Sequence, residues 1–249
     1  MKPQRYTGVI TNKLRLTKTV YHFFIQNEQP KELLFTPGQY ATFIIDDKTR
    51  RQYSFCSSPN PSSFELVVDV APMGPGSRYF LEKKVGERVV YLAPLGNFMM
   101  SDTPFRKVLI ATGTGIAPFR SMMLNEMEIK NQKSKIKNNS LQSPSFVLSH
   151  PSTSLYWGLR YEDDVYWDRE IRDLAGQYTG FQYFLCLSKP TPEWQGLRGR
   201  VTEKVFENEK SPQNSEFYLC GNSAMITEMK TRLSAMNVPD KRVKIDIFY

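Results

Sequence analysis

The chain has 249 residues and is basic, with 33 lysines and arginines against 25 aspartates and glutamates and a net charge of +8. Hydrophobic residues make up 40% of it, enough apolar side chain to build folded cores, which excludes a wholly disordered protein. It contains two histidines and three cysteines without a C-x-x-C pair, so we expect no metal site and no cysteine-ligated cluster within this sequence.

Apolar runs and net charge also limit where the protein can be located and which partners it can bind. No apolar run approaches the ~18 residues of a membrane-spanning helix, and the N-terminus has no signal-peptide core, so we expect a cytoplasmic protein. Excess positive charge suits nucleic acid, an anionic membrane or an acidic protein. No nucleic-acid motif accompanies it, and part of it lies in residues 130–144, which we interpret as a solvated surface loop.

In the first hundred residues, segments rich in β-branched and aromatic residues alternate with turn-forming segments. They predict strands at 6–11, 20–26, 40–45, 64–70 and 88–92 and one short helix at 78–84. Closely spaced strands with a single helix are typical of a small antiparallel β-barrel.

Two runs in this part carry groups that bind phosphate. Arg51 can form two parallel charge-assisted bonds, and Tyr53, on the same side of an extended strand, can cover a flat heterocycle. Ser54 adds a hydroxyl. The run Gly74-Pro-Gly-Ser77 lets a ligand approach the backbone and offers Ser77 as a helix cap. An ordinary strand end and a plain N-cap are the alternatives.

Beyond residue 100, apolar runs alternate with helical patterns. We predict strands at 107–111, 155–159, 181–187, 217–220 and 243–248 and helices at 118–129, 165–174, 202–206 and 223–236. The last helix carries four apolar residues at a spacing that suits packing on a sheet, namely Ile226, Met229, Leu233 and Met236. The alternation predicts an α/β domain with a parallel sheet at 101–249, after a barrel domain at 1–100.

Residues 107–120, KVLIATGTGIAPFR, have the pattern of a buried strand, a glycine turn and a helix start. This geometry lets backbone N–H groups receive a phosphate. Gly113 and Gly115 match only two glycines of the dinucleotide fingerprint, and the acidic residue expected roughly 20 residues later is missing. A structural turn therefore stays open beside a nucleotide-binding one.

A second strand–turn–helix signal is FYLCGNSAM at residues 217–225. It misses the hydrolase pattern G-x-S-x-G because Met225 stands in the fifth position, and no histidine is placed to act as a base. A small buried thiol at a strand end is the plain alternative for Cys220.

These elements, in this order, resemble the ferredoxin–NADP reductase family of flavin oxidoreductases. In the first half the resemblance rests on Arg51-x-Tyr53-Ser54, on Gly76-Ser77-x-x-x-Leu81 and on the run PLGNF at residues 94–98. In the second half it rests on the glycine turn, on Cys-Gly-x-x-x-Met at residues 220–225, and on residues 156–166 and 187–201.

The resemblance implies FAD in the barrel. Arg51, Gly76 and Ser77 would hold its pyrophosphate. Tyr53 would pack on the isoalloxazine, and Ser54 would lie near flavin N5, where hydride arrives. The further flavin contacts that it implies are Gln52, Val68, Val70, Phe248 and Tyr249. The aromatic residue that covers the flavin face is either Phe248 or Tyr249.

The second half would bind NADPH or NADH, with Cys220 beside the nicotinamide ring. The residues assigned to the nucleotide are Thr112, Gly113, Thr114, Gly115, Ala117, Pro118, Arg160, Ser188, Lys189, Cys220, Gly221 and Met225. Ser188 and Lys189 stand where many relatives present Ser-Arg to the adenosine 2′-phosphate. Lysine is a poorer bidentate partner than arginine, so the pair favours NADPH only weakly and leaves NADH open.

The C-terminal segment, residues 244–249, resembles the family's acid-x-aromatic ending. Asp246 stands where plant-type members have glutamate, and its shorter side chain leaves its role in proton handling open. A last strand with an aromatic end is the alternative. The catalytic residues implied by the resemblance are Ser54, Cys220, Asp246 and Tyr249.

The function implied is an FAD-dependent NAD(P)H oxidoreductase that passes single electrons to a separate acceptor. The basic charge favours an acidic carrier such as ferredoxin or flavodoxin, and we expect a monomer. Alternatives within the enzyme class are the reductase component of an oxygenase and a free-flavin or ferric reductase. From other classes, a flavin-binding electron-transfer or nucleotide-sensing subunit and a basic nucleic-acid-binding protein stay open.

Overall fold

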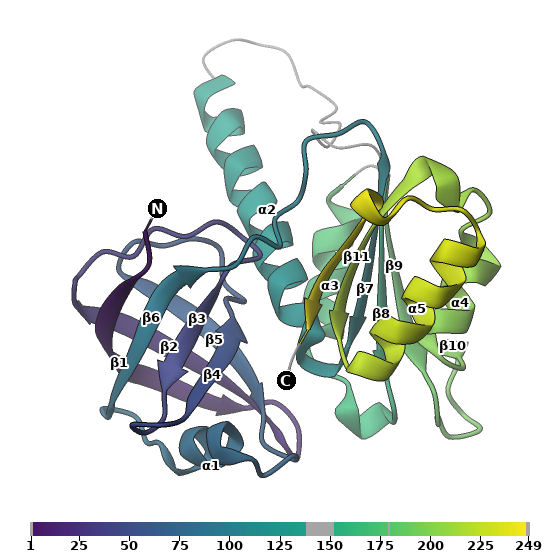
Figure 1. Cartoon of the computed structure of the whole chain (residues 1–249). Coiled ribbons are helices and arrows are strands. Elements are labelled where there is room, and N and C mark those ends of the chain that lie inside the picture. The colour runs from purple at the N-terminus through teal and green to yellow at the C-terminus, as the bar shows by residue number, and fades with distance from the viewer. Residues whose placement is uncertain (1, 138–151, 179, 248–249) are drawn as a thin grey trace. The chain divides into compact units, whose positions relative to one another are not determined.

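The computed structural model of the chain describes residues 2–137, 152–178 and 180–247. They form two compact units (Figure 1). The first unit comprises Met1–Met100 and Ala117–Ile129, and the second comprises Ser101–Ile116 and Lys130–Tyr249. A single boundary at residue 100 would have assigned Ala117–Ile129 to the second part of the chain. None of the helices among the described residues combines the length and the apolar character of a membrane span.

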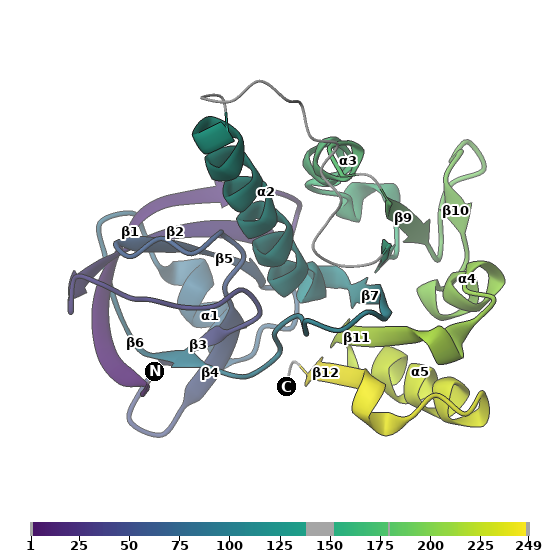
Figure 2. The same ribbon diagram turned by 90° about the horizontal axis from the view of Figure 1, so that it is seen from above.

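The first unit is built on one curled antiparallel sheet in the order β4-β3-β6-β1-β2-β5 (Figure 2). Its strands are β1 (Gln4–Arg15), β2 (Val20–Gln29), β3 (Tyr40–Ile44), β4 (Arg50–Ser54), β5 (Ser63–Asp69) and β6 (Arg88–Leu95). The predicted antiparallel barrel is thus confirmed, in the form of a half-barrel whose edge strands are β4 and β5. Just beyond β4, the Cys56 N–H donates to the Glu65 carbonyl of β5 at 3.0 Å.

Aromatic side chains fill the interior of this sheet. The Phe43 ring centroid lies 5.1 Å from that of Phe80 and 5.2 Å from that of Tyr91, and all three side chains are fully buried. Phe80 comes from the helix α1 (Pro75–Glu82), which lies at one end of the sheet (Figure 1). The Phe43 and Phe80 rings meet edge-on, an arrangement that is favourable beyond the area it buries, so α1 is held by the core rather than by its own propensity.

The helix α1 begins three residues earlier than the sequence predicts, because Pro75 occupies its first turn, where a missing N–H costs nothing. Its N-cap is Gly74, and no side chain caps it. The expectation that Ser77 caps this helix is therefore wrong. Ser77 lies inside the first turn, and its hydroxyl donates to the Asp69 carbonyl at 3.3 Å.

The helix α2 (Ala117–Lys137) is longer than predicted. Residues 130–137, which the sequence suggests as a loop, continue the helix, and residues 138–144 lie outside the described part. Polar composition misled the prediction, since lysine and glutamine are good helix formers and no glycine or proline interrupts this stretch.

A buried ion network joins α2 to the sheet of the first unit. Arg120 Nη1 donates to Glu65 Oε2 at 2.8 Å and to the Cys56 carbonyl at 2.7 Å. His22 Nε2 lies 2.9 Å from the same Glu65 oxygen. Arg120 and His22 are both nearly inaccessible, so the Arg120 charge is stabilised mainly by the Glu65 carboxylate and the Cys56 carbonyl.

The second unit contains a wholly parallel sheet in the order β10-β9-β8-β7-β11-β12, as the alternation predicts. Its strands are β7 (Arg106–Thr112), β8 (Thr153–Leu159), β9 (Phe181–Leu187), β10 (Leu197–Arg198), β11 (Ser215–Gly221) and β12 (Val243–Ile247). Its helices are α3 (Asp168–Gly176), α4 (Val201–Asn208) and α5 (Ser223–Ala235). Figure 2 shows α4 and α5 on one face of this sheet and α3 on the other.

The apolar stripe of α5 faces this sheet as predicted. Ile226, Met229 and Leu233 are buried in one core with Ile110 of β7 and Leu219 of β11. Met236 is the residue that ends the helix and is only half-buried. The methionines of α5 are therefore core residues, since the stripe lies against strands rather than in a ligand crevice.

We expect Glu65 to make stability depend on pH. Burial raises the pKa of Glu65, but the hydrogen bond from His22 and the charge of Arg120 outweigh it and hold the pKa below its usual range. The contribution of ionised Glu65 is therefore complete above about pH 4.3, the ordinary value, and is lost as the pH falls through the lower folded value.

The substitution Glu65→Gln should lower the free energy of unfolding at pH 7 by about 1 kcal/mol and leave it unchanged at strongly acidic pH. Urea unfolding at a series of pH values measures this. The control is Glu28→Gln, which removes a surface salt bridge to Arg88, whose side chain is 73% exposed, and should cost less. Equal and parallel pH profiles for the two variants would contradict the assignment.

Candidate functional site

In the first unit, three predicted flavin residues converge where β4 meets the start of α1. A Cβ added to Gly76 would lie 2.4 Å from the Tyr53 hydroxyl oxygen and 2.8 Å from Arg51 Cγ. Arg51 and Tyr53 therefore share one face of β4, as strand alternation requires, and both lie on the backbone of Gly76. Only glycine leaves room for this contact.

The start of α1 offers main-chain donors to an anion. The first N–H groups of a helix have no partner within it, and here no side chain caps them and no acidic residue occupies the first turn. A Cβ added to Gly74 would meet no atom within 4 Å among the described residues, so this backbone can be approached. The aliphatic stem of Arg51 lies against Gly76, and its guanidinium donates to the Arg50 carbonyl at 2.7 Å. Together with this arginine, the main-chain donors fit a phosphate group.

Tyr53 is held as a neutral aromatic group. Its ring packs edge-on against Phe80 at 4.8 Å and against Phe43 at 5.8 Å between centroids. Burial raises the pKa of Tyr53 to about 12, with Arg51 opposing the shift, so the phenol keeps its proton at pH 7. A fixed, uncharged ring suits contact with a planar heterocycle.

Ser54 and Gln52 lie on the other face of β4. Ser54 is directly opposite Tyr40 of β3 and is buried, and the Gln52 side-chain amide donates to the Tyr40 hydroxyl at 3.3 Å. Tyr40 in turn covers Gly96, where an added Cβ would lie 2.7 Å from its ring. A ligand that touches both Tyr53 and Ser54 must therefore reach around the end of β4, where Ser54 is the last residue.

The other predicted flavin residues divide into two groups. Val68 and Val70 have their side chains in the hydrophobic core, 1% and 5% exposed, so only their backbone is available to a ligand. Phe248 and Tyr249 lie outside the described residues.

In the second unit, the candidate crevice lies where the strand order reverses. The strands β7 and β11 lie side by side in the sheet. From β7 the chain continues to β8 on one side, and from β11 it continues to β12 on the other side. In open parallel sheets, ligands bind beyond the carboxyl ends of the strands at such a switch point. The 3-10 turn Gly113–Ile116 follows β7 there, and Gly221 ends β11.

Glycines let the two turns touch backbone to backbone. A Cβ on Gly115 would lie 2.2 Å from the Cys220 carbonyl oxygen, and one on Gly221 would lie 2.1 Å from Thr112 Oγ1. Gly113 has a positive φ of 55°, and a Cβ there would meet nothing within 4 Å among the described residues. The backbone at Gly113 is thus open to a ligand, whereas Gly115 and Gly221 close the turn behind it.

Side chains that the sequence did not single out fix this turn. Trp157 Nε1 donates to the Gly113 carbonyl at 2.9 Å. The Asn222 backbone and side-chain N–H groups both donate to Thr112 Oγ1 at 3.0 Å, while Asn222 Oδ1 caps α5 through the Met225 N–H. The N-cap preference of asparagine before a helix was the available signal for Asn222. Trp157 had none, because its contact joins β8 to the turn that follows β7, far apart in the sequence.

Cys220 and Asp246 are neighbours across β11 and β12. They are paired in register, and Cys220 Sγ lies 4.0 Å from Asp246 Oδ2. Complete burial, and then the negative charge of Asp246, raise the pKa of the Cys220 thiol well above its ordinary value. Cys220 is therefore a neutral thiol at pH 7 and not a thiolate nucleophile. Met225 nearby has its side chain in the core.

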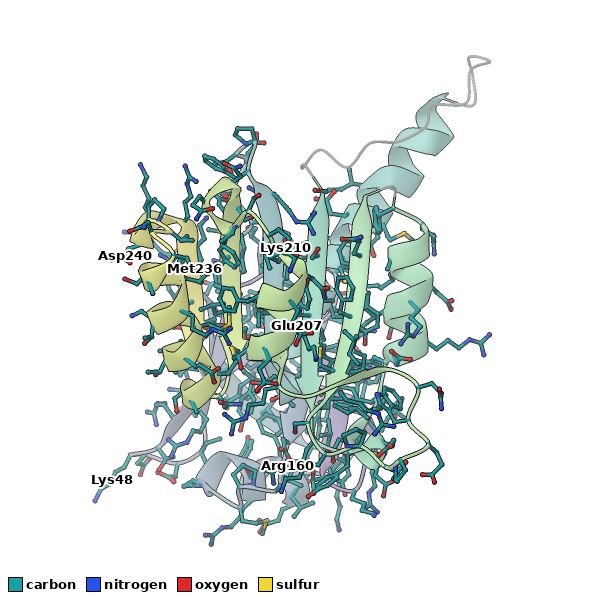
Figure 3. All side chains as sticks on the ribbon, turned by 90° about the vertical axis from the view of Figure 1, so that its right-hand side faces the viewer. Lys48, Arg160, Glu207, Lys210, Met236 and Asp240 are labelled. Carbon is teal, nitrogen blue, oxygen red and sulfur yellow. The ribbon has the colours of Figure 1, made fainter. Side chains whose placement is uncertain are left out.

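Arg160, Ser188 and Lys189 meet at the carboxyl ends of β8 and β9. The Ser188 N–H donates to the Leu159 carbonyl at 3.0 Å, and the Lys189 N–H donates to the Arg160 carbonyl at 2.9 Å. All three side chains are exposed. Figure 3 shows Arg160 at this end of the sheet and Lys210 toward the opposite end.

The remaining nucleotide residues are divided between the units. Thr114 is half-buried in the glycine turn of the second unit. Ala117 and Pro118 open α2 and are buried in the first unit. The predicted run from Thr112 to Pro118 is thus continuous in sequence and crosses from one unit to the other after Ile116.

One group of side chains in the first unit has metal-ligand chemistry. His22, Cys56 and Glu65 each offer a ligand atom, all within 4.8 Å of one another. Arg120 already contacts Glu65 Oε2, so a metal cation would face the guanidinium charge. We therefore interpret this group as an ion network that holds α2.

Two family models match consecutive parts of the sequence. An oxidoreductase FAD-binding domain matches residues 7–100, and an oxidoreductase NAD-binding domain matches residues 109–231. The first match contains the Arg51–Tyr53–Gly76 cluster, and the second contains the switch-point turn.

Curated relatives extend this match. The chain is 32% identical over 225 residues to the anthranilate 1,2-dioxygenase electron transfer component of Acinetobacter baylyi, covering 89% of this chain and 60% of the relative. It is 27% identical over 220 residues to one subunit of the Na(+)-translocating NADH-quinone reductase of Neisseria meningitidis, covering 82% and 50%. The chain therefore spans only about half to three fifths of the length of these relatives.

A solved structure has the same fold. The ferredoxin NADP+ reductase from Neisseria gonorrhoeae, with bound FAD and NADP, superimposes with a TM-score of 0.75 over 100% of both chains at 19% identity. With an FAD-binding domain followed by an NAD-binding domain, the chain belongs to the ferredoxin reductase-like family of FAD- and NAD-binding oxidoreductases.

Proposed function

We propose that this chain oxidises NADH or NADPH with FAD as its cofactor and passes the electrons singly to a separate acceptor. The observation that carries the proposal is the presence, in one chain, of a phosphate cradle at Arg51 and Gly76 and an open glycine turn at Gly113. Bound FAD would accept hydride at N5 and release its electrons one at a time.

The residues of this chain would bind and orient rather than move protons. Arg51 and the first N–H groups of α1 hold a pyrophosphate, while Tyr53 contacts the flavin ring. Hydride transfer needs the nicotinamide carbon that gives the hydride to lie about 3–3.5 Å from flavin N5. It needs no strong acid or base. The neutral Tyr53 phenol and neutral Cys220 thiol suit that requirement.

The roles at the nicotinamide end are proposed on the same basis. Gly113 lets the nucleotide lie along its backbone, and Cys220 and Asp246 border the end of β11 and β12. Ser54 is proposed to orient the flavin edge from the end of β4. The terminal aromatic residues Phe248 and Tyr249 are proposed to cover the flavin face.

The electron acceptor is proposed from the net charge of the chain and from its similarity to known proteins. A net charge of +8 favours an acidic carrier such as ferredoxin or flavodoxin. A second candidate, the reductase component of an oxygenase, is favoured by the 32% identity to the electron transfer component of a dioxygenase. Both use the same chemistry up to the departure of the electrons.

We expect the purified protein to be yellow and anaerobic NADH or NADPH to bleach it. Loss of the visible absorbance of the oxidised flavin follows the reaction. Colourless protein that takes up no added FAD would refute the proposal. Yellow protein that neither nucleotide bleaches would favour a non-catalytic flavin-binding subunit instead.

The substitution Arg51→Ala should weaken FAD binding about ten- to a hundredfold, because a charge-assisted hydrogen bond contributes ~1.5–3 kcal/mol. Titration of the apoprotein with FAD measures it. The matched control is Arg50→Ala, the preceding residue, which lies on the other face of β4 and donates to the Asp46 carbonyl. Equal losses in both variants would rule out a specific role for Arg51.

The substitution Gly115→Ala should abolish flavin reduction by the nucleotide while FAD stays bound. The added Cβ has no room against the Cys220 carbonyl, so the turn must open, whereas the cradle in the first unit is untouched. Gly176→Ala is the control, since a Cβ there meets nothing within 4 Å among the described residues. Normal reduction rates in Gly115→Ala would show that this turn does not serve the nucleotide.

A further inference from the structure

Glu162 lies beyond the carboxyl end of β8, the second strand of the β7–α2–β8 unit. In dinucleotide-binding units of this kind, an acidic side chain after the glycine turn accepts a hydrogen bond from the 2′-hydroxyl of the adenosine ribose. Counting about 20 residues from the turn ends inside α2 and finds no acid. The position beyond the end of the second strand, however, does carry an acidic residue. This residue is Glu162, which is separated from Arg160 only by Tyr161.

The Glu162 carboxylate is fixed in place by the loop that follows β9. The backbone N–H and the hydroxyl of Thr191 each donate to Glu162 Oε1 at 2.8 Å. A carboxylate has about four acceptor positions, so this pair of bonds leaves about half of them for a ligand. Ser188 and Lys189 precede Thr191 in the same loop, so the carboxylate lies beside the segment predicted to contact the adenosine.

The carboxylate is charged at neutral pH. Burial would raise the pKa of Glu162, but hydrogen bonds from its own backbone N–H and from Thr191 lower it below the usual range. Asp163 and Asp164 follow it in the same short turn and add further negative charge. A 2′-phosphate brought to this loop would meet these carboxylates as well as Lys189 and Arg160.

The charge of Arg198 acts on Glu162 and helps to lower its pKa, but the Arg198 guanidinium is already engaged by backbone carbonyls. Its guanidinium donates to the carbonyls of Thr191, Pro192 and Trp194 at 2.9, 2.6 and 2.6 Å. These bonds hold the loop closed on itself. Binding a phosphate through Arg198 would require giving up these bonds, and the Thr191 carbonyl would then keep only the Trp194 N–H as a donor.

We propose that Glu162 makes this chain prefer NADH over NADPH, by accepting a hydrogen bond from the adenosine ribose and repelling a 2′-phosphate. This inference rests on the proposed function, in which a nicotinamide nucleotide binds the second unit. It reverses the weak preference for NADPH that Ser188 and Lys189 indicate from the sequence.

The test compares the protein with its Glu162→Gln variant, which keeps the size of the side chain and an acceptor for Thr191 but removes the charge. Anaerobic flavin reduction gives the ratio of NADH to NADPH efficiency. Calorimetry with NAD+ and NADP+ gives the ratio of dissociation constants without any turnover. A defect in folding or FAD content affects both nucleotides alike, so the ratios stay informative.

We expect the wild-type protein to favour NADH, and Glu162→Gln to shift both ratios toward NADPH by about tenfold, because one negative charge facing the phosphate is removed. The shift should shrink as salt is added, because the repulsion is screened. Thr191→Val keeps the charge and should keep the preference for NADH. The control Glu207→Gln, on α4 and paired with Lys204, removes a glutamate away from Arg160 (Figure 3) and should change neither ratio.

Wild-type preference for NADPH, or the same ratios in Glu162→Gln as in the wild type, would overturn this inference and leave the proposed function intact. Failure of both nucleotides to bind and to bleach the flavin would overturn the proposed function, and this inference with it.

Discussion

The carboxyl ends of β7 and β11 can meet only because two residues there have no side chain. Gly115 brings its backbone against the Cys220 carbonyl, and Gly221 brings its own against Thr112, at distances that any Cβ would forbid. This approach lets Asn222 bond Thr112 and cap α5 at the same time. The candidate crevice is consequently formed by main chain, which cannot change rotamer and gives a ligand fixed donors.

Whether a charged side chain is paired with an opposite charge depends on how deeply it is buried. Inside the first unit, Arg120 and Glu65 are paired at 2.8 Å, and inside the second, Lys107 and Glu216 are paired at 2.7 Å with the lysine fully buried. Cations at the candidate sites, such as Arg160 and Lys189, are left exposed instead. Buried ions without partners would be too costly, so the cations available to anionic ligands are those that lie outside the cores.

The same logic explains why the candidate site holds few proton-transferring groups. Tyr53 and Cys220 are both kept neutral by burial, and both lie where the chain borders a crevice or cradle. A reaction that moves hydride and electrons between bound nucleotides needs rigid placement more than a poised acid or base. The sequence, with only two histidines, already indicated such chemistry.

Local patterns in the sequence determined most strands, the two glycine turns and the shared face of Arg51 and Tyr53, because side-chain period and glycine act within a few residues. They did not predict that α2 continues through residues 130–137, because the polar composition of that stretch suggested a loop. They also did not predict the role of Ser77, because its hydroxyl bonds the Asp69 carbonyl instead of capping the helix. Only the tertiary structure decided which strand ends lie side by side, because strand order depends on how the whole sheet packs. It is this order that allows Thr191 to donate to the Glu162 carboxylate.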